Sequence, residues 1–92
     1  MTKRSLYARE NQLLISILLA SRTNVGMTQV QLAEKSGLRQ SDISRVENGS
    51  RQVGYFELRR WMAALNLDIA ALDAELNERL LRDGIVDPLK PK

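Results

Sequence analysis

The stretch that decides the fold is TQVQLAEKSGLRQSDISRVENG, residues 28–49. Thr28 and Gln31 have the spacing of a capping box, in which each side chain bonds the backbone amide of the other residue, so a helix begins here. Gly37 can adopt the left-handed conformation that ends a helix, and a second helical pattern follows it at residues 40–47. The stretch therefore predicts two short helices joined by a tight turn.

The second of these helices has two different faces. Ile43 and Val46 stand at i and i+3 and face inward, whereas the outward positions carry small polar residues and an arginine. Asn48 and Gly49 then supply a left-handed stop. Two helices with this turn and this outward face have the layout of a helix-turn-helix, whose second helix lies in the major groove of DNA.

The composition of the chain excludes several kinds of site. Its 92 residues allow one small domain, and they include neither cysteine nor histidine. Disulfides, thiolate metal sites, cysteine nucleophiles and imidazole bases are therefore excluded. The sequence also has no phosphate-cradling glycine loop and no cluster of metal ligands. We therefore expect no catalytic residue, no metal, no cofactor and no enzymatic activity.

Positive charge gathers in the part of the chain that holds the helix-turn-helix. Residues 1–60 contain ten Lys or Arg against five Asp or Glu, a net charge of +5, whereas residues 61–92 contain four against six. This excess favours attraction to DNA phosphates, although an ordinary solvated surface would account for it equally well.

The sequence predicts a protein without a membrane partner. Its first residues do not form a signal peptide, because polar and charged residues follow the basic pair before any apolar run begins. The longest apolar block, residues 13–20, is too short to span a membrane. We therefore expect a cytoplasmic protein.

Two further helices are predicted on either side of the helix-turn-helix. Residues 1–6 are predicted to be a flexible basic arm, and a helix follows over about residues 7–22. The apolar surface of this helix is wide enough for burial on two sides, by the core and by either a partner subunit or a late C-terminal helix. A helix over about residues 55–65 has a stripe typical of a core face, formed by Leu58, Trp61, Met62 and Leu65.

The last part of the chain fits two interpretations. Residues 65–70 alternate between apolar and polar, which is the pattern of a short strand. Asp68 can instead cap a helix, and the alanine- and leucine-rich run after it is strongly helix-forming. We favour a fifth helix over about residues 68–83, followed by a tail at residues 84–92, so the predicted fold class is all-α.

In these motifs the chain resembles the Cro/repressor-type helix-turn-helix family, also called the XRE family. The family pattern stands here at its usual spacing within about residues 10–73, as Thr28-Gln29, Leu32-Ala33, Gly37, Ile43-Ser44 and Glu47-Asn48-Gly49. The resemblance implies a compact five-helix, lambda-repressor-like DNA-binding domain over residues 7–83. Its helix-turn-helix would occupy about residues 28–47.

The resemblance also implies which side chains touch DNA bases. The outward face of the recognition helix, residues 40–47, would supply Gln40, Ser41, Ser44 and Arg45. Gln40 offers the paired donor and acceptor that suit adenine, and Arg45 offers the paired donors that suit guanine. Alternatively, Arg45 forms only an ion pair with Asp42 across one turn of the helix.

Residues around the recognition helix would hold the DNA backbone, namely Thr28, Gln29, Arg39, Asn48, Arg51 and Gln52. Glu47 matches a family position that braces the scaffold by hydrogen bonding. Arg39 departs from the family pattern, because Ser or Thr normally caps the helix there. A cation at the positive end of the helix dipole becomes favourable when a phosphate lies beside it, so Arg39 is predicted to contact phosphate.

Asp42 is the second departure from the family pattern. Its charge suits the first turn of a helix but would repel a phosphate. Three interpretations stay open: Asp42 accepts a hydrogen bond from a cytosine, holds Arg45 in place, or faces away from DNA.

These features predict a sequence-specific transcriptional regulator. It would bind a pseudo-palindromic operator in double-stranded DNA as a homodimer, and repression is the simpler mode because it requires only tight binding. The predicted dimer surface combines the first helix with apolar residues of the last one, Ile69, Leu72, Leu76 and Leu80. The alternative is an antitoxin-like protein that neutralises a toxin partner and represses its own operon.

Overall fold

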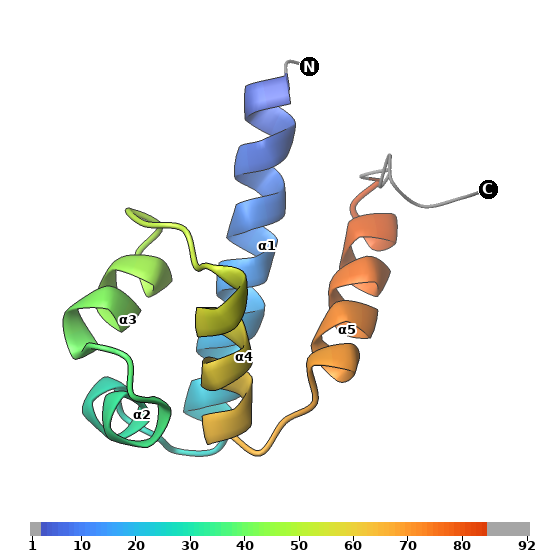
Figure 1. Ribbon diagram of the computed structural model, residues 1–92. Coiled ribbons are helices and arrows are strands. Elements are labelled where there is room, and N and C mark those ends of the chain that lie inside the picture. Colours follow the sequence, from blue (N-terminus) through green and yellow to red (C-terminus); the bar gives the residue numbers. More distant parts are fainter. Residues whose placement is uncertain (1–2, 85–92) are drawn as a thin grey trace.

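The computed structural model describes residues 3–84, with side chains from Ala8 onward. Within this range the chain forms helices and no strand (Figure 1): α1 (Lys3–Asn24), α2 (Gln29–Ser36), α3 (Gln40–Glu47), α4 (Tyr55–Ala64) and α5 (Ile69–Arg82). The all-α, five-helix prediction is therefore confirmed. Most of the predicted tail, residues 85–92, lies outside the described residues.

Helix α1 begins earlier than predicted. It starts at Lys3 and ends at Asn24, so residues 3–6 are helical and the prediction of a flexible arm is wrong for them. These positions hold Lys, Arg, Ser and Leu, none of which breaks a helix, and the helix can continue through them. With a rise of about 1.5 Å per residue, α1 is about 33 Å long, and its N-terminal half extends beyond α2 and α4 (Figure 1).

The helix-turn-helix has the predicted local structure. The Thr28 hydroxyl accepts a hydrogen bond from the Gln31 backbone N–H at 3.1 Å, and the Gln31 Oε1 accepts one from the Thr28 N–H at 2.9 Å, which completes the capping box. Gly37 ends α2 with a φ of 77°, a left-handed conformation that glycine adopts without strain. Helix α3 has the predicted bounds, and Arg39 precedes it without a side-chain cap.

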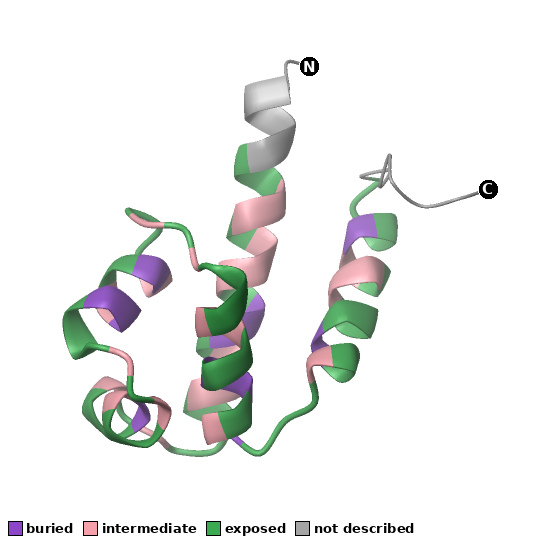
Figure 2. Cartoon of the chain, viewed as in Figure 1, coloured by how far each residue is buried: buried purple, intermediate pink, exposed green. Residues whose placement is uncertain are grey.

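One apolar core joins the five helices. Trp61 of α4 is completely buried, as predicted for a core residue. Figure 2 shows that the buried positions of the helices lie on the sides facing the middle of the domain. The core residues are Ile17, Leu18, Leu32, Ile43, Val46, Trp61, Met62, Leu65 and Leu72. Helix α1 packs against α3 and α5, so a late helix of the same chain covers its second apolar side.

The ambiguous segment before α5 is a turn followed by a helix. Asn66 has a left-handed φ of 58° just after α4, which rules out an extended strand there. The Asp68 carboxylate then accepts a hydrogen bond from the Ala70 N–H at 3.0 Å and caps α5, as predicted. The alternation of Leu65 and Leu67 has a different origin, because Leu65 is buried after α4 and Leu67 is exposed.

Candidate DNA interface

The outward face of α3 is the first part of the candidate interface. Gln40, Ser41 and Arg45 are exposed and Ser44 is half-buried, while Ile43 and Val46 are buried on the opposite face. The packing of the inner face fixes the rotation of the helix, so the four predicted base-contacting side chains share one outward surface. Their chemistry suits base edges in the major groove.

Gln40 is oriented by a chain of hydrogen bonds. Its Nε2 donates to the Oε1 of Gln29 at 2.9 Å, and the Nε2 of Gln29 donates to the Oε1 of Glu47 at 2.8 Å. Gln40 keeps its own carbonyl oxygen and a second N–H. An adenine needs one acceptor and one donor, so the oriented amide retains both groups for base contact. The sequence did not indicate this link between Gln29 and Gln40.

Glu47 braces the interface from inside, as the family resemblance implied. The Nε and Nη2 of Arg22 donate to its two carboxylate oxygens at 2.6 and 2.8 Å. Only 12% of the Arg22 side chain and 6% of the Glu47 side chain are exposed. Arg22 Nη1 also donates to the Met27 carbonyl at 2.7 Å, so this bidentate pair ties the end of α1 to the end of α3.

Asp42 faces away from the outward surface of α3. It is buried, and its carboxylate oxygens lie 3.0 Å from the Nε of Arg39 and 3.7 Å from the Nε of Arg51. The interpretations in which Asp42 accepts from cytosine or holds Arg45 are therefore wrong. Both arginines thus pair with Asp42 at the side of α3, and Arg45 is left exposed to solvent.

The two arginines predicted to contact the DNA backbone, Arg39 and Arg51, have different surroundings. Arg39 has 80% of its side chain exposed, so its guanidinium can reach a phosphate beside the start of α3. Arg51 lies between two carboxylates, with its guanidinium 2.7 Å from Glu57 and 3.7 Å from Asp42. The structure thus gives Arg51 a bracing position that sequence reasoning missed. The sequence does contain a signal for Glu57, which stands three residues after Gly54, the spacing of a capping box. Its carboxylate accepts a hydrogen bond from the Gly54 N–H at 2.8 Å.

The Arg51–Glu57 pair predicts a loss of stability in acid. The hydrogen bond from Arg51, and next the one from the Gly54 N–H, lower the pKa of Glu57 from 4.5 to about 2. A carboxyl whose folded pKa is depressed stabilises the fold above its unfolded pKa, and that contribution is lost as pH falls from about 4.5 towards 2. We expect urea unfolding to show a smaller stability difference between about pH 7 and about pH 3 in Glu57→Gln than in the wild type. Equal differences in the two proteins would contradict the assignment.

The other predicted phosphate contacts lie at the ends of the helices. Thr28 is exposed and caps α2, where its hydroxyl accepts from the Gln31 N–H. Asn48 is exposed, and its Oδ1 accepts from the Ser50 N–H at 2.9 Å. Gln52 is exposed in the loop between α3 and α4. The three residues are therefore accessible to a DNA backbone, but their contact with it stays a prediction.

The predicted dimer residues need a correction. Leu72 and Leu80 are buried within the single chain, so their side chains are not available to a partner. Ile69 and Leu76 are half-buried and pack against the core. An apolar stripe on a helix has the same pattern whether a partner subunit or the chain's own first helix covers it, which explains the error.

An apolar groove lies beside these residues. It has a volume of about 410 Å³ and runs between α1, α4 and α5, where its apolar lining includes Leu14, Tyr55, Leu58, Ile69 and Leu76. Phe56 is 75% exposed at the start of α4, and its ring meets that of Tyr55 edge to face at 5.5 Å. The sequence analysis did not single out this pair. Both residues fall outside the core stripe of α4, which was a signal that they are exposed.

The buried inner face of α3, its polar outer face and the braced Gln40 define a helix-turn-helix DNA-binding protein. The chain belongs to the Cro/repressor-type (XRE) helix-turn-helix family, because the helix-turn-helix family model matches residues 18–72, more than half of the chain. A comparison with curated protein sequences found no match. Within residues 3–84, no helix combines the length and the hydrophobicity that a membrane crossing requires.

Solved structures of a controller protein are similar to this chain. The wild-type restriction-modification controller protein C.Esp1396I is 27% identical, with a TM-score of 0.74 over 79% of this chain and 95% of that chain. The C.Esp1396I tetramer in complex with its natural 35 base-pair operator is 28% identical, with a TM-score of 0.72 over 78% of this chain and 95% of that chain. The similarity therefore extends over nearly the whole controller protein.

Proposed function

We propose that this protein is a controller-type transcriptional regulator that binds a two-fold symmetric operator as a homodimer. The observation that carries the proposal is the outward surface of α3, on which Gln40 is held by the Gln29–Glu47 chain and Arg45 points to solvent. The similarity to a controller protein that has been solved on its operator supports the same conclusion.

The arrangement suggests how a half-site is read. Helix α3 enters the major groove, where Gln40 contacts adenine and Arg45 contacts guanine. Ser41 and Ser44 lie beside them and contact base edges or phosphate. The first N–H groups of α2 and the exposed Arg39 hold the DNA backbone on either side, which sets the register of the reading helix.

The apolar groove supports pairing with a second copy of the chain. A two-fold interface is self-complementary, so one chain must offer both a projection and a matching depression. Phe56 is the projection and the groove between α1, α4 and α5 is the depression. Binding to a two-fold symmetric operator requires such a pair to hold its two copies of α3 about one turn of DNA apart.

We expect Phe56→Glu to convert the dimer into a monomer. Phe56 is mostly exposed in the single chain, so the substitution leaves the core intact and removes only the apolar projection. Sedimentation equilibrium would measure the association constant, and circular dichroism would check the fold. Leu81→Glu, at another exposed apolar position, is the matched control. A Phe56→Glu protein that associates as tightly as the wild type would contradict this dimer surface.

Repression is the simplest mode of regulation for this protein, because it requires only tight binding to DNA. A dimer bound over a promoter blocks polymerase by occupancy alone, and the protein would do so in the compartment that holds its DNA, the cytoplasm. The antitoxin alternative is not proposed, because no feature of the described residues and none of the similar structures reported above favours a toxin partner.

A footprint on the DNA upstream of the protein's own gene, recorded over a salt series, tests the proposal. We expect a protected site with two-fold symmetry, whose affinity falls steeply as salt rises because cations are released from the phosphates. Weak binding with no preference between this DNA and a random duplex would overturn the regulator proposal.

A further inference from the structure

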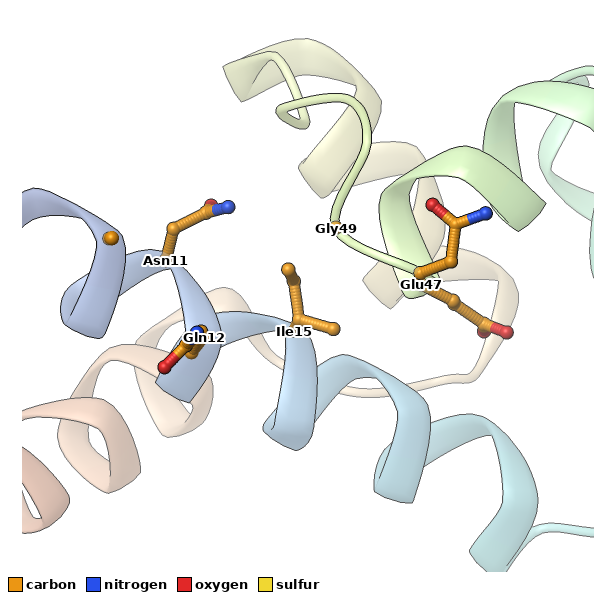
Figure 3. Close-up of a pocket in the computed structure, with 7 residues that line it drawn as sticks. Asn11, Gln12, Ile15, Glu47 and Gly49 are labelled. Carbon is orange, nitrogen blue, oxygen red and sulfur yellow. The ribbon is translucent and has the colours of Figure 1, made fainter.

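A second groove lies between α1 and the end of the recognition helix. It has a volume of about 360 Å³ and is lined on one side by the α1 residues Ala8, Asn11, Gln12 and Ile15. The opposite side is formed by Glu47, Asn48 and Gly49 (Figure 3). The groove therefore begins where the predicted DNA interface ends, at Asn48.

The α1 side of this groove is one helical stripe. Its four residues follow the spacing i, i+3, i+4 and i+7, so they share the face that is turned towards the end of α3. Figure 3 shows Asn11 and Ile15 pointing from α1 towards the loop that carries Gly49. Gly49 has a left-handed φ of 84°, and a β-carbon at this position would lie 3.8 Å from the Cδ1 of Ile15, so the loop comes close to α1 at Ile15.

The polar groups of the groove suit an anion. The side-chain amides of Asn11, Gln12 and Asn48 each carry two N–H donors. Within residues 8–84, these N–H groups donate to no side chain or carbonyl, so they can donate to a ligand in the groove. Glu47 is the one acidic residue that lines the groove, and Arg22 neutralises its buried carboxylate at 2.6 Å. Neutral amide donors next to a basic helix-turn-helix are typical contacts of DNA phosphates.

We infer that this groove holds a phosphate of the DNA backbone, so that the DNA-binding surface continues from α3 onto the N-terminal half of α1. The inference rests on the proposed function, because it takes α3 to be the reading helix. Asn48 and Gly49 follow the recognition helix and form one wall of the groove, so a duplex on α3 that reached Asn48 would bring a phosphate to the α1 stripe opposite. Asn11 and Gln12 would then add a contact that positions the duplex without reading its sequence.

Charge substitutions on α1 test this inference. Gln12→Glu and Asn11→Asp keep the shape of the side chain and add a negative charge, so we expect each to weaken binding to operator and random duplex alike, by about tenfold for a dimer. Gln12→Lys should tighten binding to both DNAs and steepen the salt dependence. Asn77→Asp on α5 makes the same change in charge outside the groove and is the control. Thermal unfolding of each variant checks the fold.

A scan of uncharged phosphates locates the contact. Operators carrying a single methylphosphonate at successive positions should show one position per half-site that weakens the wild type but no longer weakens Gln12→Glu further. If wild-type protein binds the operator and the α1 variants behave like Asn77→Asp, the inference fails while the proposed function stands. If wild-type protein shows no preference for the operator, the proposed function fails and the inference fails with it.

Discussion

Replacing Glu47 by alanine is expected to lower the free energy of unfolding by about 3 kcal/mol or more. The carboxylate is nearly buried and accepts two short hydrogen bonds from Arg22 and a third from Gln29. Its removal leaves the Arg22 guanidinium, itself mostly buried, without its counterion. A buried charge without a partner destabilises the fold by far more than the intact ion pair stabilises it.

Urea denaturation at neutral pH measures this loss. The control is the double variant Arg22→Met/Glu47→Leu, which removes both charges and fills similar volume. We expect it to recover much of the stability, because no charge is left buried alone. If Glu47→Ala and the double variant were equally stable, desolvation of Arg22 would not be the cause of the loss.

The same substitution links stability to DNA binding. Gln29 donates to Glu47 and accepts from Gln40, so loss of the carboxylate frees the amide that orients Gln40. The isosteric Glu47→Gln variant would keep a hydrogen-bond acceptor for Gln29 but lose the charge that holds Arg22. Positioning of the reading helix and stability of the domain therefore depend on one carboxylate.

The parts of the fold that sequence alone predicted are those with local signals. The capping box of Thr28 and Gln31, the left-handed Gly37 and the Asp68 cap each depend on residues within one turn, and each is present in the structure. The start of α1 was missed because residues 3–6 contain no such signal. A basic, polar composition is as compatible with the first turns of a helix as with a flexible arm.

The errors at the site arise from contacts between distant elements. The sequence left three interpretations of Asp42 open, one of them beside Arg45 on the same helix, whereas packing against the loop after α3 brings Arg51 to the carboxylate. Leu72 and Leu80 were expected to face a partner because their stripe had no assigned neighbour in the sequence. Only the path of the chain after α4 shows that α1 covers that stripe.

Arg45→Ala is expected to remove most of the sequence preference of the protein. Asp42 pairs with Arg39 and Arg51, so among the described residues no carboxylate competes with DNA for the Arg45 guanidinium. A bidentate contact to guanine discriminates by about 1–3 kcal/mol, and a dimer makes it twice. Operator affinity should therefore fall by at least about 30-fold, while affinity for random duplex falls much less.

Two matched arginine variants make this prediction specific. Arg39→Ala removes the same charge from an exposed position beside α3, and it should weaken operator and random duplex by similar factors, because a phosphate contact carries no sequence information. Arg82→Ala removes a charge from the end of α5, outside the candidate DNA interface and the apolar groove, and should change the affinity for neither operator nor random duplex. Competition binding of the three variants on operators with each guanine replaced in turn separates these cases. If Arg45→Ala kept the operator-to-random ratio of the wild type and lost affinity uniformly, Arg45 would hold phosphate, and base reading would depend on Gln40 and the serines of α3.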